Sequence, residues 1–369
     1  MQPNPLFRPW QYGALHLANR VVMAPMTRSM SPGGVPGAQV AAYYRRRAEG
    51  GVGLIITEGT TIDRPAASGD AAIPNFHTAA SLAGWAQVVE QVHQAGGRIA
   101  PQLWHQGMAR QPGTGPHPEA ASEGPSGLSN TGELAGVAMT EADIAATVEA
   151  FAEAAGQAKA LGFDAVELHG AHGYLIDQFF WAGSNRRSDG YGGDLARRTR
   201  FGAEVVRAVR ARVGPGFPII FRFSQWKLQD YEARLARTPE ELAQFLGPLT
   251  GAGVDIFHCS TRRFWEPEFA GSSLNLAGWT KQLTGHPCIT VGSVGLQGDD
   301  FIRGFRASPD TLAMVADLGE LDRRLGADEF DLVAVGRALL QDPDWAAKIR
   351  QGRTGELQPF SRKAFATLS

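Results

Sequence analysis

The chain has 369 residues, which is enough for two domains or for one large barrel. Its 35 basic and 37 acidic side chains give a formal net charge of -2, so it lacks the long-range field that attracts nucleic acids or anionic membranes. A hydrophobic fraction of 43% and a charged fraction of 20% are those of an ordinary folded protein, which excludes the disordered and fibrous classes.

Location and redox chemistry are also limited by composition. No apolar stretch of about 18 residues could span a bilayer, and the first residues lack the charged-then-apolar order of a signal peptide, so we expect a cytoplasmic protein. The only cysteines are Cys259 and Cys288, too few for a disulfide framework, a four-cysteine zinc site or an iron–sulfur cluster. Any redox chemistry must therefore come from an organic cofactor.

Eight short apolar runs, each followed by a loop and a helical pattern, repeat along the chain. The expected strands are Val21–Pro25, Gly53–Thr57, Arg98–Leu103, Ala165–His169, Ile219–Phe223, Val254–Cys259, Pro287–Val291 and Asp331–Val335. The expected helices are Gln39–Ala48, Thr78–Ala95, Glu141–Ala160, Ala196–Arg212, Pro239–Gly251, Leu274–Leu283, Pro309–Leu325 and Arg337–Arg350. Because no linker divides the chain, we predict an α/β fold with residues 1–369 in a single (β/α)8 TIM barrel.

Two segments fall outside this repeat. Tyr12–Arg20 alternates apolar and polar residues about a Gly13-Ala14 turn, which predicts a hairpin that caps the bottom of the barrel before the first strand. Gln106–Val137 follows the third strand and is rich in Gly, Pro and Ser. Loops of this length usually have a function, so we expect it to lie over the barrel mouth as a lid.

The end of the fourth strand carries His169, His172 and Tyr174 within six residues. Barrel enzymes build their sites at the carboxyl ends of the strands. The spacing of three can bring both imidazoles to one side, where their N–H groups could bind a carbonyl or nitro oxygen. Tyr174 would stand beside the same substrate with a phenolic proton to give.

Two other interpretations of this histidine pair remain open. His-x-x-His can ligate zinc or iron, but we expect the nearest carboxylate, Glu167, to point away from His169, so we predict no metal. Alternatively, backbone carbonyls satisfy both histidines, and they serve only in packing.

The last two strands end in Gly292-Ser293 and Gly336-Arg337, where barrels often bind ligand phosphates. Glycine lets backbone N–H groups approach phosphate oxygens, and Arg337 adds a bidentate cation. Simple turn requirements explain the glycines about as well.

Arg222 ends the apolar fifth strand, and a cation there must meet an anion or a strong acceptor. Either Glu58 or Glu167 could form a structural salt bridge with it. We favour a contact to a reduced flavin, which is anionic around N1. Gln102 could donate and accept at the flavin pyrimidine edge. Thr27 could donate to the opposite carbonyl or bond to its own loop.

At these residues the sequence resembles the Old Yellow Enzyme family of FMN-dependent NADH:flavin oxidoreductases and ene-reductases. The resemblance covers nearly the whole chain. Its motifs are Ala24-Pro25-Met26-Thr27-Arg28, Gln102-Leu103-Trp104, Gly162-Phe163-Asp164, His169-Gly170-Ala171-His172-Gly173-Tyr174-Leu175, Asn185-Arg186, Asp189-Gly190-Tyr191-Gly192-Gly193 and Val335-Gly336-Arg337.

The resemblance implies non-covalent FMN and a role for each site residue. The implied cofactor-binding residues are Ala24, Pro25, Met26, Thr27, Gly59, Gln102, Arg222, Gly292, Ser293, Gly336 and Arg337. The implied substrate-binding residues are Trp104, His169, His172 and Tyr174, with the last three catalytic. The reaction implied by the resemblance is a ping-pong reaction with two half-reactions. NADH or NADPH first reduces FMN and leaves. An electron-poor alkene then takes the hydride at its β-carbon while Tyr174 protonates the α-carbon.

Two alternative functions are also compatible with these motifs. A storage or sensor protein could hold FMN without turnover, although it would need neither the histidines nor Tyr174. A barrel lyase could bind a phosphorylated substrate at the same glycines, although it would want a strand-end lysine or a carboxylate-bound metal, and no expected strand contains Lys. The expected partners are NAD(P)H and small alkenes, not nucleic acid or membrane, and the chain could be a monomer or a homo-oligomer.

Overall fold

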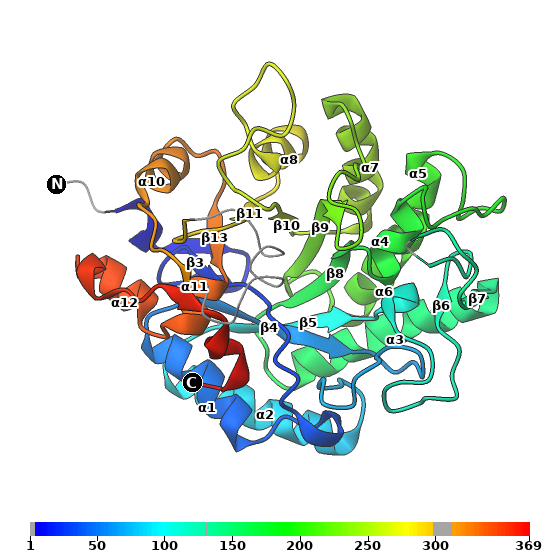
Figure 1. Cartoon of the computed structure of the whole chain (residues 1–369), viewed down its shortest axis with the longest axis horizontal. Coiled ribbons are helices and arrows are strands. Elements are labelled where there is room, and N and C mark those ends of the chain that lie inside the picture. The colour runs from blue at the N-terminus through cyan, green and yellow to red at the C-terminus, as the bar shows by residue number, and fades with distance from the viewer. Residues whose placement is uncertain (1–3, 130, 298–311) are drawn as a thin grey trace.

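The computed structural model describes residues 4–129, 131–297 and 312–369, and eight strands close into a barrel at its centre (Figure 1). Neighbouring strands are parallel and follow one another in chain order. The barrel strands are β3 (Val21–Met23), β4 (Leu54–Thr61), β5 (Ile99–Trp104), β8 (Val166–His172), β9 (Ile219–Lys227), β10 (Ile256–Ser260), β11 (Cys288–Val291) and β13 (Leu332–Val335). All eight predicted strands and the predicted TIM barrel are therefore confirmed.

Helices surround this barrel (Figure 1). They are α1 (Ala38–Glu49), α2 (Ala79–Gln94), α3 (Glu141–Ala160), α4 (Leu175–Phe180), α5 (Leu195–Arg198), α6 (Arg200–Val213), α7 (Pro239–Ala252), α8 (Leu276–Thr284), α10 (Gly319–Gly326), α11 (Arg337–Gln341) and α12 (Trp345–Arg350). Short 3-10 turns are η1 (Pro5–Phe7), η2 (Pro32–Gly34), η3 (Gly107–Ala109), η4 (Thr354–Glu356) and η5 (Arg362–Ala366). Helix α3 has the predicted bounds, because Thr140 and Asp143 form a capping box at its start.

Two predicted helices are interrupted in the structure. The pattern over Ala196–Arg212 is divided into α5 and α6 at Thr199. The pattern over Arg337–Arg350 is divided into α11 and α12 around Pro343. A proline lacks the backbone N–H that a continuous helix needs and disfavours helical geometry in the residue before it, which explains the second break.

The predicted helix over Pro309–Leu325 is confirmed only in its second half. Its first residues, 309–311, lie outside the described residues, and α10 begins only at Gly319. Between them, strand β12 (Leu312–Ala313) pairs antiparallel with β14 (Phe360–Ser361). Pairing with a distant strand decides the conformation here, which the local pattern could not reveal.

The N-terminal hairpin is confirmed and closes one end of the barrel. Strands β1 (Trp10–Tyr12) and β2 (Leu15–Leu17) pair antiparallel about Gly13, which has φ +54°. The apolar side chains of β2 pack against an interior layer that fills this end of the barrel. That buried layer consists of Leu15, Leu17, Val22, Ala24, Leu54, Ile56, Ala100, Ala165, Ile220, Ile256, Ile289, Leu332 and Ala334.

The long loop after β5 is more ordered than its composition predicts. It contains η3 and two short paired strands, β6 (Glu123–Gly124) and β7 (Val137–Ala138). Glu123 accepts two hydrogen bonds from Arg64, and its carboxylate lies 3.0 Å from His105 Nε2. Backbone Met108 donates to Gln178 of α4. These contacts hold the loop against α4 and the end of β5.

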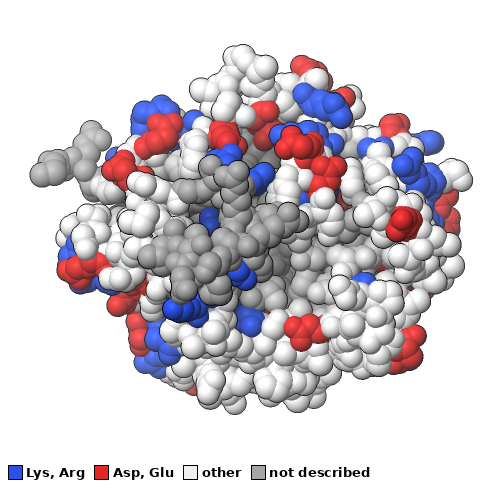
Figure 2. Space-filling model, in the orientation of Figure 1, with Lys and Arg blue, Asp and Glu red and all other residues white. Residues whose placement is uncertain are grey.

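The surface is mixed in charge. Acidic and basic side chains alternate over the face in Figure 2, in keeping with the small net charge. Within residues 4–129, 131–297 and 312–369, no helix has both the length and the apolar character needed to cross a bilayer.

Candidate active site

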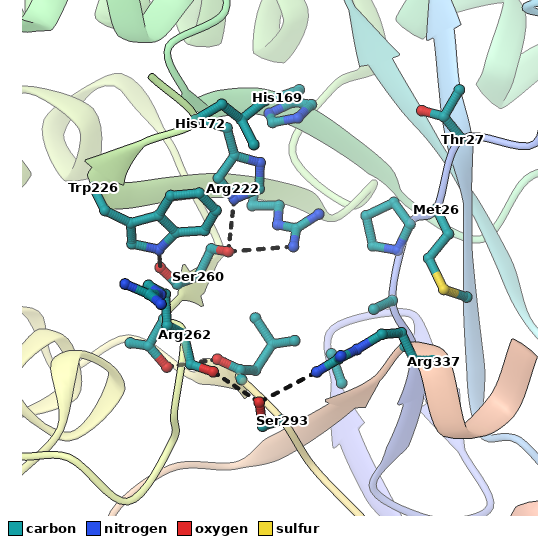
Figure 3. Close-up of a pocket in the computed structure, with 18 of the residues that line it drawn as sticks. Met26, Thr27, His169, His172, Arg222, Trp226, Ser260, Arg262, Ser293 and Arg337 are labelled. Carbon is teal, nitrogen blue, oxygen red and sulfur yellow. Dashed lines mark hydrogen bonds between the residues drawn. The ribbon is translucent and has the colours of Figure 1, made fainter. Parts of the chain in front are cut away.

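A cavity of about 650 Å³ lies at the carboxyl ends of the barrel strands. Its lining brings together residues from several regions that are far apart in the sequence, as Figure 3 shows in part. Of the predicted site residues, it contains Ala24, Pro25, Met26, Thr27, Gln102, Trp104, His169, His172, Tyr174, Arg222, Gly292, Ser293, Gly336 and Arg337.

Gly59 is the exception. It lies inside β4, where an added Cβ would come within 2.6 Å of the Trp104 ring. Gly59 is not among the residues that line the cavity, so its role in binding the cofactor stays a prediction. The missing side chain makes room for Trp104, whose ring does line the cavity.

The end of β8 aims three polar rings at the cavity. His169 and His172 lie with ring centroids 5.2 Å apart and planes at 89°. Tyr174 is the N-cap residue just before α4, and its ring lies 5.1 Å from that of His169 and 4.8 Å from that of Trp104. His172 has φ +66° and Gly173 has φ +81°, so the chain turns sharply between the two histidines and the tyrosine.

The protonation states of these rings suit hydrogen-bond donation. Burial, with the charge of Arg222, holds the pKa of His169 and of His172 well below its usual value. Burial raises the pKa of Tyr174 to about 12. At neutral pH both imidazoles are therefore neutral and the phenol keeps its proton.

Arg222 projects from β9 into the cavity (Figure 3) and is only 7% exposed. Its Nη2 donates to Ser260 Oγ at 3.3 Å, and its Nε has no partner. Neither Glu58 nor Glu167 forms an ion pair with it, and within the described chain no other carboxylate does either. The alternative that Arg222 forms a structural salt bridge with Glu58 or Glu167 is therefore not observed among the described residues.

Glu167 lies in the barrel interior and not on the outside. Its carboxylate accepts a hydrogen bond from Gln102 Nε2 at 2.7 Å and lies 2.6 Å from His258 Nδ1. The prediction that Glu167 points away from His169 is wrong, because residues two apart on a strand share a face.

Metal binding is nevertheless not supported by a ligand cluster. Glu167 is engaged with Gln102 and His258. In the ranges that the structure describes, no three His, Cys, Asp or Glu side chains converge as metal ligands would.

The opposite part of the cavity is built from glycine and arginine. Gly292 has φ +150°, and an added Cβ would lie 2.7 Å from Thr261 Oγ1 and 2.9 Å from a backbone nitrogen. Ser293 Oγ donates to the Arg262 carbonyl at 3.1 Å and accepts from Arg337 Nη2 at 3.4 Å (Figure 3). Arg337 forms no ion pair with a carboxylate among residues 4–129, 131–297 and 312–369.

Several residues of the lining are not among those that the sequence predicts. Ser260 ends β10, and Thr261 and Arg262 follow it directly, so the rule that site residues lie at strand ends applies to them as well. The residues without such a signal are Trp226, Leu228 and Tyr231, from the extended β9 and the loop after it, and Phe365 from η5. The lining includes no residue of the 106–137 loop, so the expected lid does not form this wall.

These features fit a flavin mononucleotide. The cavity volume is typical of a small-ligand site. Arg222 and Arg337, both without a carboxylate partner among the described residues, could face an anionic ring and a phosphate. The residues that could hold the ring are Thr27, Gln102 and Arg222, and those that could hold the phosphate are Gly292, Ser293, Gly336 and Arg337.

Comparison with known sequences gives a consistent set of relatives. The model of the NADH:flavin oxidoreductase / NADH oxidase family matches residues 5–303. The flavin oxidoreductase hxnT of Emericella nidulans is 40% identical over 98% of this chain and 94% of its own length. The NADH oxidase of Thermoanaerobacter brockii is 34% identical over 96% of this chain, and 12-oxophytodienoate reductase 7 of Oryza sativa is 41% identical over 57% of it.

The match in length differs among these relatives. The chain spans about half of the NADH oxidase and of the rice reductase, 52% and 56% of their lengths. Among solved structures, morphinone reductase superimposes with a TM-score of 0.80 and 32% identity, over 99% of this chain and 93% of that one. A related structure, a morphinone reductase in complex with tetrahydroNAD, gives a TM-score of 0.79.

Proposed function

Because this chain belongs to the NADH:flavin oxidoreductase / NADH oxidase family, the FMN-binding Old Yellow Enzyme family, we propose that it reduces electron-poor alkenes with electrons from NAD(P)H. The relatives named 12-oxophytodienoate reductase and morphinone reductase support this reaction class. The observation that carries the proposal is the meeting of two neutral imidazoles and a protonated phenol in one cavity.

FMN would supply the chemistry of hydride transfer between NAD(P)H and the alkene. The residues proposed to hold FMN form two groups, one suited to the flavin ring and one suited to the phosphate. Arg222 places a fixed positive charge in the cavity, which favours an anionic ring, and Gln102 offers amide hydrogen bonds. Arg337 and the backbone of Gly292 and Ser293 favour a phosphate at the other end.

His169 and His172 are proposed to bind the activating oxygen of the substrate. An α,β-unsaturated aldehyde, ketone, imide or nitroalkene gains negative charge on this oxygen as hydride reaches the β-carbon. Two neutral N–H donors in a buried cavity stabilise that charge more than they stabilise the starting alkene, which is the condition for acceleration.

Tyr174 is proposed to protonate the α-carbon. Its pKa, raised to about 12, keeps the proton on the phenol throughout the neutral range. An enolate-like carbon is basic enough to take a proton from such a donor, so the high pKa does not prevent the transfer. The proton would come from Tyr174 and bound FMN would supply the hydride, so the alkene would gain the elements of H2.

The two rival functions are less well supported. A storage protein would need no donor triad. A lyase would need a strand-end amine or metal, and although β9 extends to Lys227, its amine donates to buried Asp177 at 2.8 Å and does not line the cavity.

Anaerobic spectroscopy of the purified protein separates the three functions. We expect yellow protein that loses its absorbance with NADH or NADPH and regains it on addition of an enone or a nitroalkene. The matched variant, His169→Ala with His172→Ala, should keep FMN and respond slowly to the enone. Colourless protein that binds phosphorylated sugars would favour the lyase, and bleached protein that no alkene restores would favour storage.

A further inference from the structure

Ser260 lies between the histidine pair and the buried arginine. It is the last residue of β10, is 2% exposed and lines the cavity. Its Oγ is 2.8 Å from His172 Nε2 and 3.3 Å from Arg222 Nη2 (Figure 3). The Ser260 hydroxyl therefore contacts both the His172 imidazole, which can carry its proton on either nitrogen, and the Arg222 guanidinium, whose nitrogens all carry protons.

The direction of these hydrogen bonds follows from the chemistry of the three groups. A guanidinium can only donate, so Ser260 Oγ must accept from Arg222. The hydroxyl keeps one hydrogen, which can donate to His172 Nε2. Accepting from a cation also polarises the O–H group and makes it a better donor.

In the neighbouring His169, the hydrogen-bonding roles of the two ring nitrogens are the reverse of those in His172. His169 Nδ1 accepts from the backbone N–H of Ala171 at 3.4 Å, so its proton resides on Nε2. If Ser260 donates to His172 Nε2, the proton of His172 resides on Nδ1. Each imidazole then keeps one N–H that is not used by the protein.

The ring of His172 has little freedom to exchange these roles by rotating. Trp226 stacks on it with centroids 4.5 Å apart and planes at 27°. The Trp226 indole is itself fixed, because its Nε1 donates to the Ser260 carbonyl at 3.1 Å. The backbone N–H of His172 donates to Ser224 Oγ at 3.0 Å. Stacking thus fixes the plane of the ring, and the contact with Ser260 Oγ identifies Nε2 as the nitrogen that faces the hydroxyl.

We propose that Ser260 is a positioning residue that holds His172 as its Nδ1–H tautomer, so that the nitrogen not bound to Ser260 donates to the substrate oxygen. The inference rests on the proposed function, because only a donor role requires this tautomer. The opposite tautomer would donate to Ser260 and turn a lone pair toward the substrate oxygen. Ser260 thereby decides whether His172 attracts or repels the substrate.

The direct test is the tautomer itself, measured on the FMN-loaded protein with 15N-labelled histidine. Protonated and unprotonated ring nitrogens give well separated 15N signals, and His172→Ala identifies the signals of His172. We expect protonated Nδ1 in the wild type and in Ser260→Thr, which keeps the hydroxyl. Ser260→Ala should shift the signals toward protonated Nε2. The matched control, Ser224→Ala, removes a hydroxyl that accepts from the backbone N–H of His172 and donates to the Trp226 carbonyl but bonds to no imidazole nitrogen, and it should leave the tautomer unchanged.

A binding measurement provides the second readout. We expect the oxygen of 4-nitrophenol to accept from both histidines, so its affinity should fall about tenfold in Ser260→Ala and about twofold or less in Ser260→Thr, with FMN content as the folding control. Protonated Nε2 in the wild type, or an unchanged tautomer in Ser260→Ala, would overturn the inference. Loss of the Nδ1–H tautomer in Ser224→Ala as well would also overturn it. If the tautomer depends on Ser260 but no alkene is reduced, the proposed function fails and the tautomer assignment stands.

Discussion

Two arginines at the cavity, Arg222 and Arg337, have no carboxylate partner among the described residues. Arg222 contacts a serine hydroxyl, and Arg337 contacts Ser293 Oγ, while most other buried cations in the described chain meet carboxylates or carbonyl groups. Burial lowers the pKa of both arginines, so the protein bears a cost for their charge. An anionic ligand would remove much of this cost.

The phosphate role of Arg337 can be tested by comparing two flavins. Arg337→Ala should weaken FMN binding by about 1.5–3 kcal/mol, the range for hydrogen bonds to a charged group. Riboflavin lacks the phosphate and should lose almost no affinity. Titration of the apoprotein with each flavin measures both values. Equal losses for the two flavins would indicate that Arg337 supports the fold and does not bind phosphate.

Tyr174→Phe should separate the two half-reactions. The variant keeps the ring and its packing but has no proton to give, so reduction by NAD(P)H should continue at nearly the wild-type rate. The subsequent reaction with cyclohexenone should slow by about 10²–10⁴-fold, the effect of losing a general acid. Stopped-flow absorbance measures each step. A loss that falls mainly on the NAD(P)H step would contradict the role.

Glu58 should make folding stability dependent on pH. It is 1% exposed, and burial raises its pKa to about 7, although the backbone N–H groups of Arg28 and Ser29 oppose the shift. Because the folded chain holds this proton more tightly than the unfolded chain, the contribution to stability is complete below about pH 4.3 and is lost as the pH rises through 7.

Glu58→Gln should remove that dependence. Urea unfolding at pH 5 and pH 8 should show a decrease in the free energy of unfolding that is smaller in the variant, by an amount on the order of 3 kcal/mol. Glu268, whose pKa burial also raises to about 7, contributes to both proteins and cancels in the comparison. An identical decrease in both proteins would mean that Glu58 ionises normally.

At the scale of elements, a buried ion pair fixes the turn between β8 and α4. Lys227 at the end of β9 donates to Asp177 of α4 at 2.8 Å, and both side chains are fully buried. The other Asp177 oxygen accepts from the backbone N–H of Gly173 at 2.6 Å. The pair therefore links three elements beside His172 and Tyr174.

Breaking this pair should affect both stability and ligand binding. Asp177→Asn leaves a buried lysine without its counter-ion, so unfolding should become easier by about 3–5 kcal/mol. The double variant Asp177→Leu with Lys227→Met should recover most of the Tm, because no buried charge remains. It should still bind phenols more weakly than wild type, because Gly173 has lost its acceptor. Full recovery of phenol affinity would show that the turn does not depend on Asp177.

The elements differ in how well the sequence predicts them. The eight barrel strands are buried on both faces, so their apolar runs are clear in the sequence. The segment over 312–318 is not helical, because β12 pairs with β14, which follows it by almost fifty residues of sequence. The extension of β9 to Lys227 is not predicted either, because it is polar and depends on pairing with His172 of β8.

At the scale of the molecule, one topological rule predicts most of the site. Polar residues at the ends of parallel strands must meet at one end of a closed barrel, so the sequence alone is enough to group His169, Gln102 and Arg222. It cannot place Phe365 with them, because η5 reaches the cavity only through tertiary contacts. Arg28 makes these contacts, donating to the carbonyls of Ala364 and Phe365 at 3.1 and 3.2 Å. Residues 28 and 365 are too far apart in the sequence for any local pattern to indicate that they are in contact.

The hairpin of β1 and β2 has a kinetic consequence. With the barrel filled at that end by its buried apolar layer, the proposed nicotinamide and alkene would both reach the cavity from the opposite end of the barrel, and we predict that they exclude each other. Steady-state rates should then give parallel double-reciprocal lines, and an excess of either substrate should inhibit competitively against the other. Intersecting lines without such inhibition would mean that both substrates bind at once. High NAD(P)H would therefore slow turnover, and the fastest reaction would require a balanced ratio of donor to acceptor.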